Sequence, residues 1–264
     1  MKPAELKLIV QEKYGKIAAA SEGEDKTSCG CSPDCCSTAD YTVFSEKYDQ
    51  LEGYNPDADL NLGCGIPTAF AGIKKGDHVL DLGSGAGNDC FVARALTGES
   101  GHVTGIDFTG PMLLKAEENR IKLGYPNIDF VEGDIEEMPL PDNSFDVVLS
   151  NCVLNLVPDK HRAFSEIMRV LKPAGHFCVS DVVIKGEMPD KMRSDAELYV
   201  GCVAGASEYD QYISIIRDAG FVNIVIHKEK QILLPDTSMP VITDGNTPGI
   251  FSITLSASQP MINS

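Results

Sequence analysis

Nine cysteines are the first chemically suggestive feature of this 264-residue chain. Four of them fall within one short stretch, KTSCGCSPDCCST, and are Cys29, Cys31, Cys35 and Cys36. Three more stand apart, and they are Cys64 in NLGCGIP, Cys152 in SNCVLNL and Cys202 in YVGCVAGA. Thiolates are soft ligands for zinc and for thiophilic metalloids, and paired thiols form disulfides. The pattern allows a disulfide, a structural zinc site or a binding site for a soft substrate.

A second feature is a glycine-rich turn with acidic residues around it. VLDLGSGAG places an apolar run directly before Gly83, Gly85 and Gly87, and such glycines let a backbone turn tightly and approach a ligand closely. The spacing differs from the G-x-G-x-x-G of dinucleotide-binding dehydrogenases. Asp81 precedes the turn, Asp107 ends the next expected strand and Asp134 the third. Asp107 could accept hydrogen bonds from ribose hydroxyls, and Asp134 beside Ile135 suits an adenine edge, so we expect a nucleoside cofactor here.

The elements that would position these residues are strands alternating with helices from His78 onward. The expected strands are HVLDLG, HVTGID, IDFVEGD, FDVVLSN and HFCVSDVV, and the expected helices are DCFVARALTG, PMLLKAEENRIKLG and HRAFSEIMRVLKPAG. This alternation predicts right-handed βαβ units, and therefore an α/β fold with a doubly wound, mostly parallel sheet.

The flanking segments predict additions at both ends of this sheet. AELKLIVQEKYGKIAAA predicts an amphipathic helix before the cysteine-rich loop. SEYDQYISIIRDAG predicts a helix that stops at Gly220, and NIVIHKEKQIL and FSITLSAS predict two closing strands with antiparallel pairing, separated by a long loop. We expect an N-terminal helix and cysteine-rich segment over 1–70, a cofactor-binding domain over 71–184 and an acceptor-side region over 185–264.

Charge and composition exclude several classes of partner. The formal net charge is -17 and the pI is about 4.6. Proteins that bind nucleic acids or anionic membranes do so through clustered Lys and Arg residues. No window approaches the roughly 18 to 20 apolar residues of a membrane helix. We expect a cytoplasmic monomer that acts on a small molecule, without nucleic acid or membrane. In the cytosol the cysteines would be reduced thiols with a chemical role.

The glycine turn and its acids together resemble the class I S-adenosylmethionine-dependent methyltransferases, over about residues 77–183. The resemblance implies a Rossmann-like fold, with S-adenosylmethionine lying across the carboxyl ends of the first three strands. The cofactor-binding residues expected on this basis are Asp81, Gly83, Ser84, Gly85, Gly87, Asn88, Asp107, Phe108, Met112, Asp134, Ile135 and Asn151.

The methyl acceptor is indicated by the three isolated cysteines. In such a fold Cys64, Cys152 and Cys202 converge on the carboxyl edge of the sheet, and three thiols without a nearby histidine favour a soft acceptor over an oxygen or nitrogen. Trivalent arsenic fits, because it binds three thiolates and keeps a lone pair for attack on the methyl group. Cys90 and Cys178 lie in apolar runs and are expected to be core residues.

The chain resembles the arsenite S-adenosylmethionine methyltransferases over about residues 54–221. The stretches that carry this resemblance are LGCGIP, DLGSGAGNDCF, SNCVLNL and GCVAGA, with the tyrosine-containing helix and AGF that follow. This implies arsenite, or its thiol conjugate, as substrate, Cys152 and Cys202 as arsenic ligands, and Cys64 as a third catalytic thiol. The family also has a cysteine in its N-terminal segment, for which Cys36 is one candidate. A thiol reductant such as glutathione or a thioredoxin-type partner is expected too. Ile66 departs from the family, which usually has Asn after Gly-Cys-Gly.

Alternatives remain open for the cysteines and for the activity. The cluster from Cys29 to Cys36 could close a tetrahedral zinc site, but its C-x-C-x₃-C-C spacing favours a loop that captures arsenite or forms a disulfide with Cys64. The chain could instead be a C-methyltransferase of a quinone or another small molecule, which needs no thiols. It could also be a thiol-based metalloid sensor that uses the fold only as a scaffold.

Overall fold

A computed structural model of the chain describes residues 2–20, 46–186, 205–232 and 249–260. The cysteine-rich cluster and Cys202 lie outside the described residues, as do 187–204 and the predicted loop over 233–248. Within the described part, no helix is long and apolar enough to cross a membrane.

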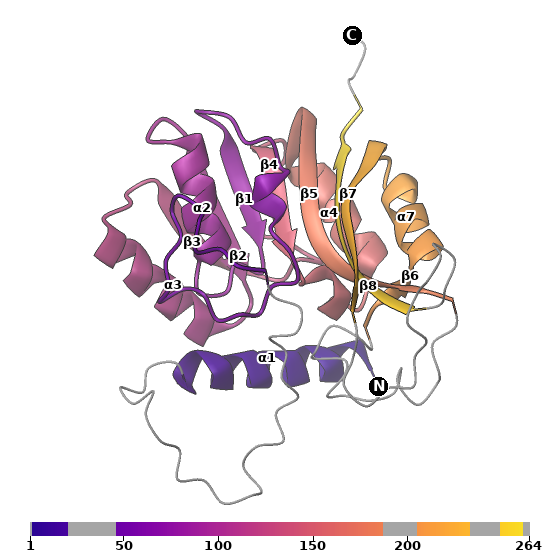
Figure 1. The fold of residues 1–264 in the computed structure, drawn as a ribbon, viewed down its shortest axis with the longest axis horizontal. Helices are drawn as coiled ribbons and strands as arrows, with labels where there is room; N and C mark the ends of the chain where they lie inside the picture. Colours follow the sequence, from indigo (N-terminus) through magenta and orange to yellow (C-terminus); the bar gives the residue numbers. More distant parts are fainter. Residues whose placement is uncertain (1, 21–45, 187–204, 233–248, 261–264) are drawn as a thin grey trace, which may run out of the picture.

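The centre of the molecule is one sheet in which parallel strands alternate with helices (Figure 1). The strand order is β3-β2-β1-β4-β5-β8-β7, and the direction of winding reverses between β1 and β4. This confirms the predicted doubly wound α/β fold. The elements of this half are β1 (His78–Leu82), α2 (Asn88–Thr97), β2 (His102–Asp107), α3 (Gly110–Leu123), β3 (Ile128–Glu132), β4 (Phe145–Asn151), α4 (Lys160–Val170) and β5 (Leu171–Lys185).

The predicted antiparallel edge is present as well. β8 (Gly249–Ser258) pairs antiparallel with both β5 and β7 (Val222–Ile232). A short strand, β6 (Ser207–Glu208), pairs with the end of β5 and leads into α7 (Tyr209–Asp218), and Gly220 follows this helix with φ of 96°. Two 3₁₀ turns, η3 (Pro67–Ala69) and η4 (Leu154–Leu156), complete this part of the fold.

Successive strand residues point to opposite faces of the sheet, so one buried strand supplies two cores. Val79 of β1 packs in a cluster with α2 that also contains Cys90 and Cys178, both fully buried as predicted. Leu80 belongs to the cluster on the other face, where Phe164 of α4 packs near Tyr212 of α7. Because both faces are covered, every residue of β1 after His78 is buried.

One boundary differs from the prediction. The helix expected through LKPAG ends at Val170, and Leu171 already has extended backbone angles at the start of β5. The reason is Pro173, which disfavours helical angles in the residue before it and cannot donate a helical hydrogen bond. At the other end of α4, the side chain of Asp159 caps the helix by accepting a hydrogen bond from the Arg162 backbone N–H.

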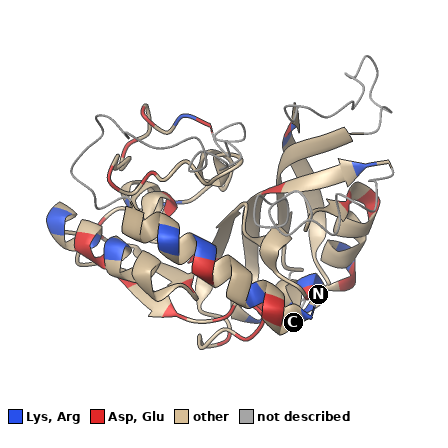
Figure 2. Ribbon diagram, turned by 90° about the horizontal axis from the view of Figure 1, so that it is seen from below, with Lys and Arg blue, Asp and Glu red and all other residues tan. Residues whose placement is uncertain are grey.

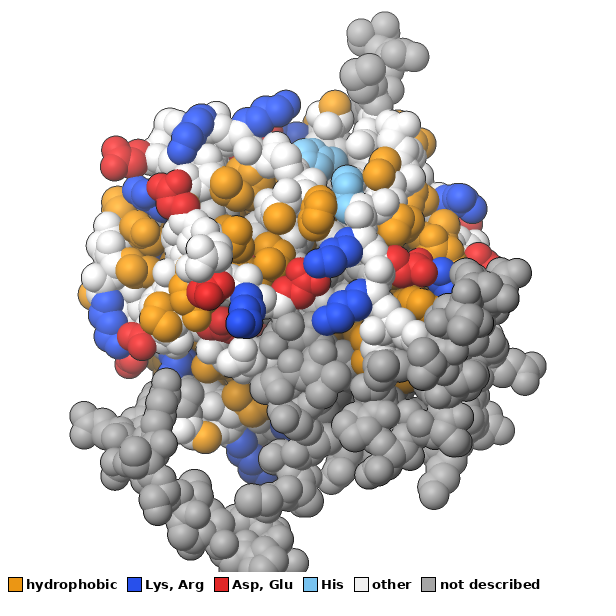
Figure 3. Space-filling model, viewed as in Figure 1, with side chains coloured by type: hydrophobic (Ala, Val, Ile, Leu, Met, Phe, Trp, Pro, Cys, Tyr) orange, Lys and Arg blue, Asp and Glu red, His pale blue; other side chains and the backbone are white. Residues whose placement is uncertain are grey.

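The N-terminal helix α1 (Pro3–Ala20) lies across the end of the sheet toward which the parallel strands run (Figure 1). It runs alongside α3, where a Cβ atom added at Gly15 would make only an ordinary contact with Pro111. Seen from this end, Lys and Arg alternate with Asp and Glu along the helices (Figure 2). Among the described residues on the face shown in Figure 3, basic side chains also lie among acidic ones and form no large basic patch for a polyanion.

Candidate active site

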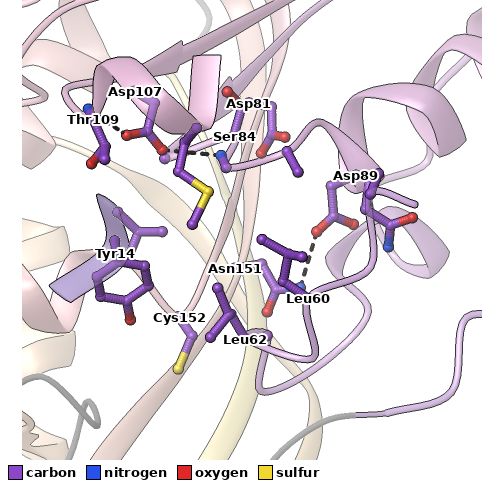
Figure 4. Close-up of a pocket in the computed structure, with 18 of the residues that line it drawn as sticks. Tyr14, Leu60, Leu62, Asp81, Ser84, Asp89, Asp107, Thr109, Asn151 and Cys152 are labelled. Carbon is purple, nitrogen blue, oxygen red and sulfur yellow. Dashed lines mark hydrogen bonds between the residues drawn. The ribbon is translucent and has the colours of Figure 1, made fainter. Parts of the chain in front are cut away.

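A pocket lies at the carboxyl ends of β1, β2 and β4, where the winding direction of the sheet reverses and such folds bind their ligands (Figure 4). Most of the predicted cofactor residues line it, together with one thiol: Asp81, Gly83, Ser84, Gly85, Asn88, Asp107, Phe108, Met112, Ile135, Asn151 and Cys152.

The glycine turn after β1 has the backbone conformation that its sequence requires. Gly83 and Gly85 have φ of 63° and 53°, in the left-handed region that favours glycine. A Cβ atom on Gly83 would lie 2.5 Å from a methyl group of Val153, whereas one on Gly85 would meet nothing within 4 Å. Gly83 is therefore needed for packing as well as for conformation. Gly85 is needed for its backbone conformation, and it leaves space beside the pocket.

Asp107 fixes this turn from the end of β2. Its carboxylate accepts hydrogen bonds from the backbone N–H of Gly85 at 3.0 Å and of Thr109 at 2.8 Å (Figure 4). Burial raises the pKa of Asp107, and the backbone donors partly oppose that effect. The carboxylate faces the pocket, so it can brace the turn and contact a ligand.

Two further carboxylates lie in the pocket wall. Asp81 accepts a hydrogen bond from the Cys90 thiol at 3.2 Å, and burial, with the nearby Asp89 and Asp107, holds its pKa well above the usual range. Asp89, at the start of α2, accepts hydrogen bonds from Tyr48 and Asn151, and burial raises its pKa to about 6. Asp89 was not among the predicted residues, although its place beside Asn88 at a helix N-terminus was a usable signal.

The chemistry of the wall limits what the pocket can hold. Among the described residues that line it, none is Lys, Arg or His. Three buried carboxylates without a basic side chain disfavour phosphate groups and favour hydroxyl-bearing or cationic ligands. The buried Oγ of Ser84 and Oδ1 of Asn88 have no hydrogen-bond partner among the described residues, so a polar ligand would satisfy them. These features fit a nucleoside cofactor with a cationic centre.

Two predicted cofactor residues lie outside the pocket wall. The carboxylate of Asp134 is bonded to Lys7 of α1 at 2.5 Å, and Lys7 also pairs with Glu136. Binding of an adenine amine by Asp134 stays a prediction. Gly87 begins α2 with φ of 95°, and a Cβ there would lie 2.9 Å from the ring of Phe91, which gives this glycine a packing role.

The structure brings two of the three predicted catalytic thiols into one region. Cys152 lines the pocket, and Cys64 packs in the same buried cluster, next to residues of α1 and β5. Both side chains are almost fully buried. Cys152 has φ of 62°, which is costly for a residue with a side chain, and its backbone N–H donates to the Ser180 carbonyl at 2.7 Å. Cys202 lies outside the described residues.

Sequence reasoning missed the residues that close the pocket from outside the parallel core. They come from α1, from the segment before β1 and from the start of α3, and are Val10, Tyr14, Tyr48, Leu60, Leu62 and Thr109. α1 is held in place partly by Gln11, whose side chain donates to the Phe108 carbonyl at 2.8 Å. The apolar residues of α1 predicted that one side of the helix is buried, but the sequence did not indicate which part of the fold it packs against.

Comparison with known proteins agrees with this geometry. Residues 73–220 match the family described as a methyltransferase domain. An arsenite methyltransferase of Halobacterium salinarum is 41% identical over 85% of this chain and 59% of its own length. One of Aquipseudomonas alcaligenes is 34% identical over 87% of this chain and 66% of its own length. The crystal structure of an arsenic(III) S-adenosylmethionine methyltransferase from Chlamydomonas reinhardtii superposes with a TM-score of 0.64 at 38% identity, covering 75% of this chain and 68% of that one.

A Rossmann-like sheet with a ligand pocket at its switch point and an acid-lined glycine turn defines a class I methyltransferase fold. The chain belongs to the methyltransferase-domain family, whose match covers more than half of its residues. It spans 59% and 66% of the lengths of the two curated relatives, so the acceptor and the full activity are matters for proposal.

Proposed function

We propose that this protein transfers a methyl group from S-adenosylmethionine to trivalent arsenic held by cysteine thiolates. The observation that carries the proposal is the position of Cys152, which lines the acid-rich pocket and shares a buried cluster with Cys64. A soft ligand set beside a pocket for a cationic nucleoside suits an arsenical acceptor. The arsenite methyltransferase relatives support the same reading.

The cofactor would be held by the residues of the glycine turn and by the strand-end carboxylates. S-adenosylmethionine, when bound, supplies a methyl group on a positively charged sulfonium. Asp107 would accept hydrogen bonds from the ribose, while Ser84 and Asn88 offer polar atoms that have no partner among the described residues. Asp89, when ionised, would attract the positive charge of the methionine part, and Asp81 would form part of the wall through its hydrogen bond from Cys90. Met112 and Ile135 supply apolar wall for the base.

The thiols would hold the acceptor. Cys152 and Cys202 would be the arsenic ligands and Cys64 a third thiolate. The arsenic lone pair would form the new As–C bond while the methyl–sulfur bond of the sulfonium breaks and its electron pair stays on sulfur, so arsenic would formally lose two electrons. Oxidation of two thiols to a disulfide returns these electrons, and an external thiol reductant of the glutathione or thioredoxin type resets the disulfide. The protein mainly positions the reactants, since no proton has to be removed from the acceptor.

The N-terminal cysteines would capture arsenite or its thiol conjugate and pass it to the buried thiols. Their spacing is the support for this role, because a structural zinc site prefers two separated C-x₂₋₄-C pairs. A quinone C-methyltransferase would have no use for Cys152 at the pocket wall. A metalloid sensor would not need the glycine turn and its three acids.

The test is incubation of the purified protein with S-adenosylmethionine, arsenite and a thiol, followed by separation and elemental detection of the arsenic species. We expect methylated arsenicals that depend on all three additions. A protein that binds the cofactor but forms only a methylated quinone, or no methylated product, would refute the proposal.

A further inference from the structure

We propose that Asn151 is a positioning residue that sets Cys64 beside Cys152, and that it does not bind the cofactor. This inference rests on the proposed function for its chemical meaning, since two thiols matter only if they share a soft ligand. It reassigns a residue that the sequence placed among the cofactor contacts. The observations that carry it are the hydrogen bonds of one side-chain amide.

The amide of Asn151 grips the backbone on both sides of the peptide that joins Cys64 to Gly65. Its Oδ1 accepts a hydrogen bond from the Cys64 N–H at 3.0 Å, and its Nδ2 donates to the Gly65 carbonyl at 3.0 Å. The partners fix the orientation of the amide, because a backbone N–H must face the oxygen and a carbonyl must face the NH₂ group. The side-chain amide of Asn151 therefore pairs with this segment as a backbone peptide group of an adjacent strand would.

The remaining donor capacity of the amide is also used inside the protein. Nδ2 lies 2.7 Å from the Tyr48 hydroxyl and 3.0 Å from Oδ2 of Asp89. An amide nitrogen has two protons, and three acceptors of the protein already surround it. No donor is left for a cofactor, although the side chain forms part of the pocket wall.

The glycines on both sides of Cys64 allow its backbone to lie close to Asn151 and Ser180. A Cβ atom on Gly63 would lie 2.6 Å from Nδ2 of Asn151, and one on Gly65 would lie 2.4 Å from the Ser180 hydroxyl oxygen. At either position a side chain would force the segment or its neighbour, Asn151 or Ser180, to move. The Cys64 carbonyl is held as well, by the hydroxyl of Ser252.

Because Cys152 directly follows Asn151 in the sequence, the hydrogen bonds of Asn151 link the positions of both cysteines. Cys152 follows Asn151 directly, and its own backbone is held by the Ser180 carbonyl. The residue that fixes the Cys64 backbone is thus one peptide away from the second thiol. Loss of the amide should let Cys64 move relative to Cys152 while the glycine turn and Asp107 keep their contacts.

The experiment measures arsenical binding and cofactor binding separately, without turnover. The starting protein is the full chain with Cys29, Cys31, Cys35, Cys36 and Cys202 replaced by serine, which leaves Cys64 and Cys152 and the fully buried Cys90 and Cys178. The probe is phenylarsine oxide, a trivalent arsenical that bridges two thiols. Its affinity is measured by titration and its stoichiometry by mass spectrometry.

The matched control is Asn127→Ala. Asn127 also donates through Nδ2 to two backbone carbonyls, those of Gly98 and Gly101 at 3.0 Å and 2.9 Å, but it does not line the pocket. Both affinities are measured at pH 8, well above the pKa of Asp89, because loss of the Asn151 hydrogen bond should raise that pKa. We expect Asn151→Ala to weaken phenylarsine oxide binding by ~10-fold or more while S-adenosylmethionine affinity stays within ~2-fold, because the glycine turn and Asp107 keep their contacts. Asn127→Ala should change neither affinity. Tyr48→Phe, which keeps the amide itself, should weaken arsenical binding in the same direction and less.

Three outcomes would overturn the inference. One is loss of cofactor affinity with unchanged arsenical affinity in Asn151→Ala, which would return Asn151 to the cofactor site. Another is equal loss of arsenical binding in Asn127→Ala, which would mean general destabilisation. A third is failure of the two-thiol protein to bind the probe. If the probe binds as expected but the wild-type protein methylates no arsenic, the positioning role stands and only the proposed function fails.

Discussion

The hydroxyl of Tyr48, from the segment before β1, lies 2.9 Å from Oδ1 of Asp89 at the start of α2. This contact joins two elements that are 41 residues apart, and it places a hydrogen-bonded carboxyl in the pocket wall. Burial raises the pKa of Asp89 from 3.8 to about 6, and hydrogen bonds from Asn151 and Tyr48 partly oppose the rise. The charge of the pocket should therefore change in an experimentally convenient pH range.

S-adenosylmethionine affinity should fall as the pH drops through about 6. Below that pH Asp89 is neutral and no longer attracts a sulfonium or ammonium group, so the loss should approach at most ~10-fold per pH unit. Asp89→Asn should remove this part of the pH dependence. Calorimetric titration at pH 5 and pH 8 checks the prediction, and equal affinities for the wild type at both values would contradict it.

The stability of the fold should respond to pH through Asp181 on β5. Burial raises the pKa of this carboxyl from 3.8 to about 7, with Lys160 and the Tyr212 hydroxyl opposing the rise. Between these two values the folded state binds more protons than the unfolded state, so the free energy of unfolding falls as the pH rises through this window. Asp181→Asn should be more stable than the wild type at pH 8, by at most about 4 kcal/mol, because it removes a buried charge.

Urea unfolding at pH 4 and pH 8 measures this difference. It should shrink to less than about 1 kcal/mol at pH 4, where Asp181 is neutral in the folded state and only about half ionised in the unfolded state. Asp129→Asn, at an exposed carboxylate on β3, serves as the control and should show no such pH-dependent gain. A variant of Asp181 that is less stable than the wild type at pH 8 would show that its charge is favourable.

Asp107→Ala should weaken S-adenosylmethionine binding by roughly 1 to 3 kcal/mol, because it leaves ligand hydroxyls and the Gly85 N–H without their acceptor. Asp107→Asn should lose less, since its amide oxygen can still accept one of these bonds. Equilibrium dialysis with labelled cofactor gives the affinities. Unchanged binding in the alanine variant would remove Asp107 from the cofactor site.

Replacing Cys29, Cys31, Cys35 and Cys36 together by serine separates capture from a structural metal site. If they belong to a substrate-handling loop, the melting temperature should stay unchanged and part of the arsenic methylation should be lost. The loss should be clearest in later methylation rounds, where arsenic already carries a methyl group and one thiol fewer holds it. Zinc that copurifies at one ion per chain, with unfolding on its removal, would instead establish a structural site.

The parts of the site that follow from the sequence are those fixed by local geometry. Gly83, Gly85 and Asp107 could be placed at the pocket because a glycine turn after a strand and an acid at the next strand end have only one position in a doubly wound sheet. The same reasoning predicted the doubly wound sheet and its antiparallel edge, whereas the strand order came from the structure.

Contacts between distant segments could not be predicted in this way. Lys7 and Asp134 are 127 residues apart, and Asn151 and Cys64 are 87 residues apart. Neither pair has a periodicity or spacing that would reveal it. Asp134 and Asn151 were assigned to the cofactor as polar residues at strand ends. The structure adds a partner within the protein for each, and cofactor binding by Asp134 stays a prediction.

The central claim is that a pocket thiol holds arsenic while it receives the methyl group. A single-turnover experiment with methyl-labelled S-adenosylmethionine and arsenite tests it in the wild type, Cys152→Ser, Cys202→Ser and Cys178→Ser. Serine cannot replace a thiolate on arsenic, and Cys178 is buried in the core on the far side of the sheet from the Phe164 cluster. We predict that the label reaches arsenic in the wild type and in Cys178→Ser only, with cofactor affinity near that of the wild type in all four proteins. Substantial labelled arsenic from Cys152→Ser would contradict the account.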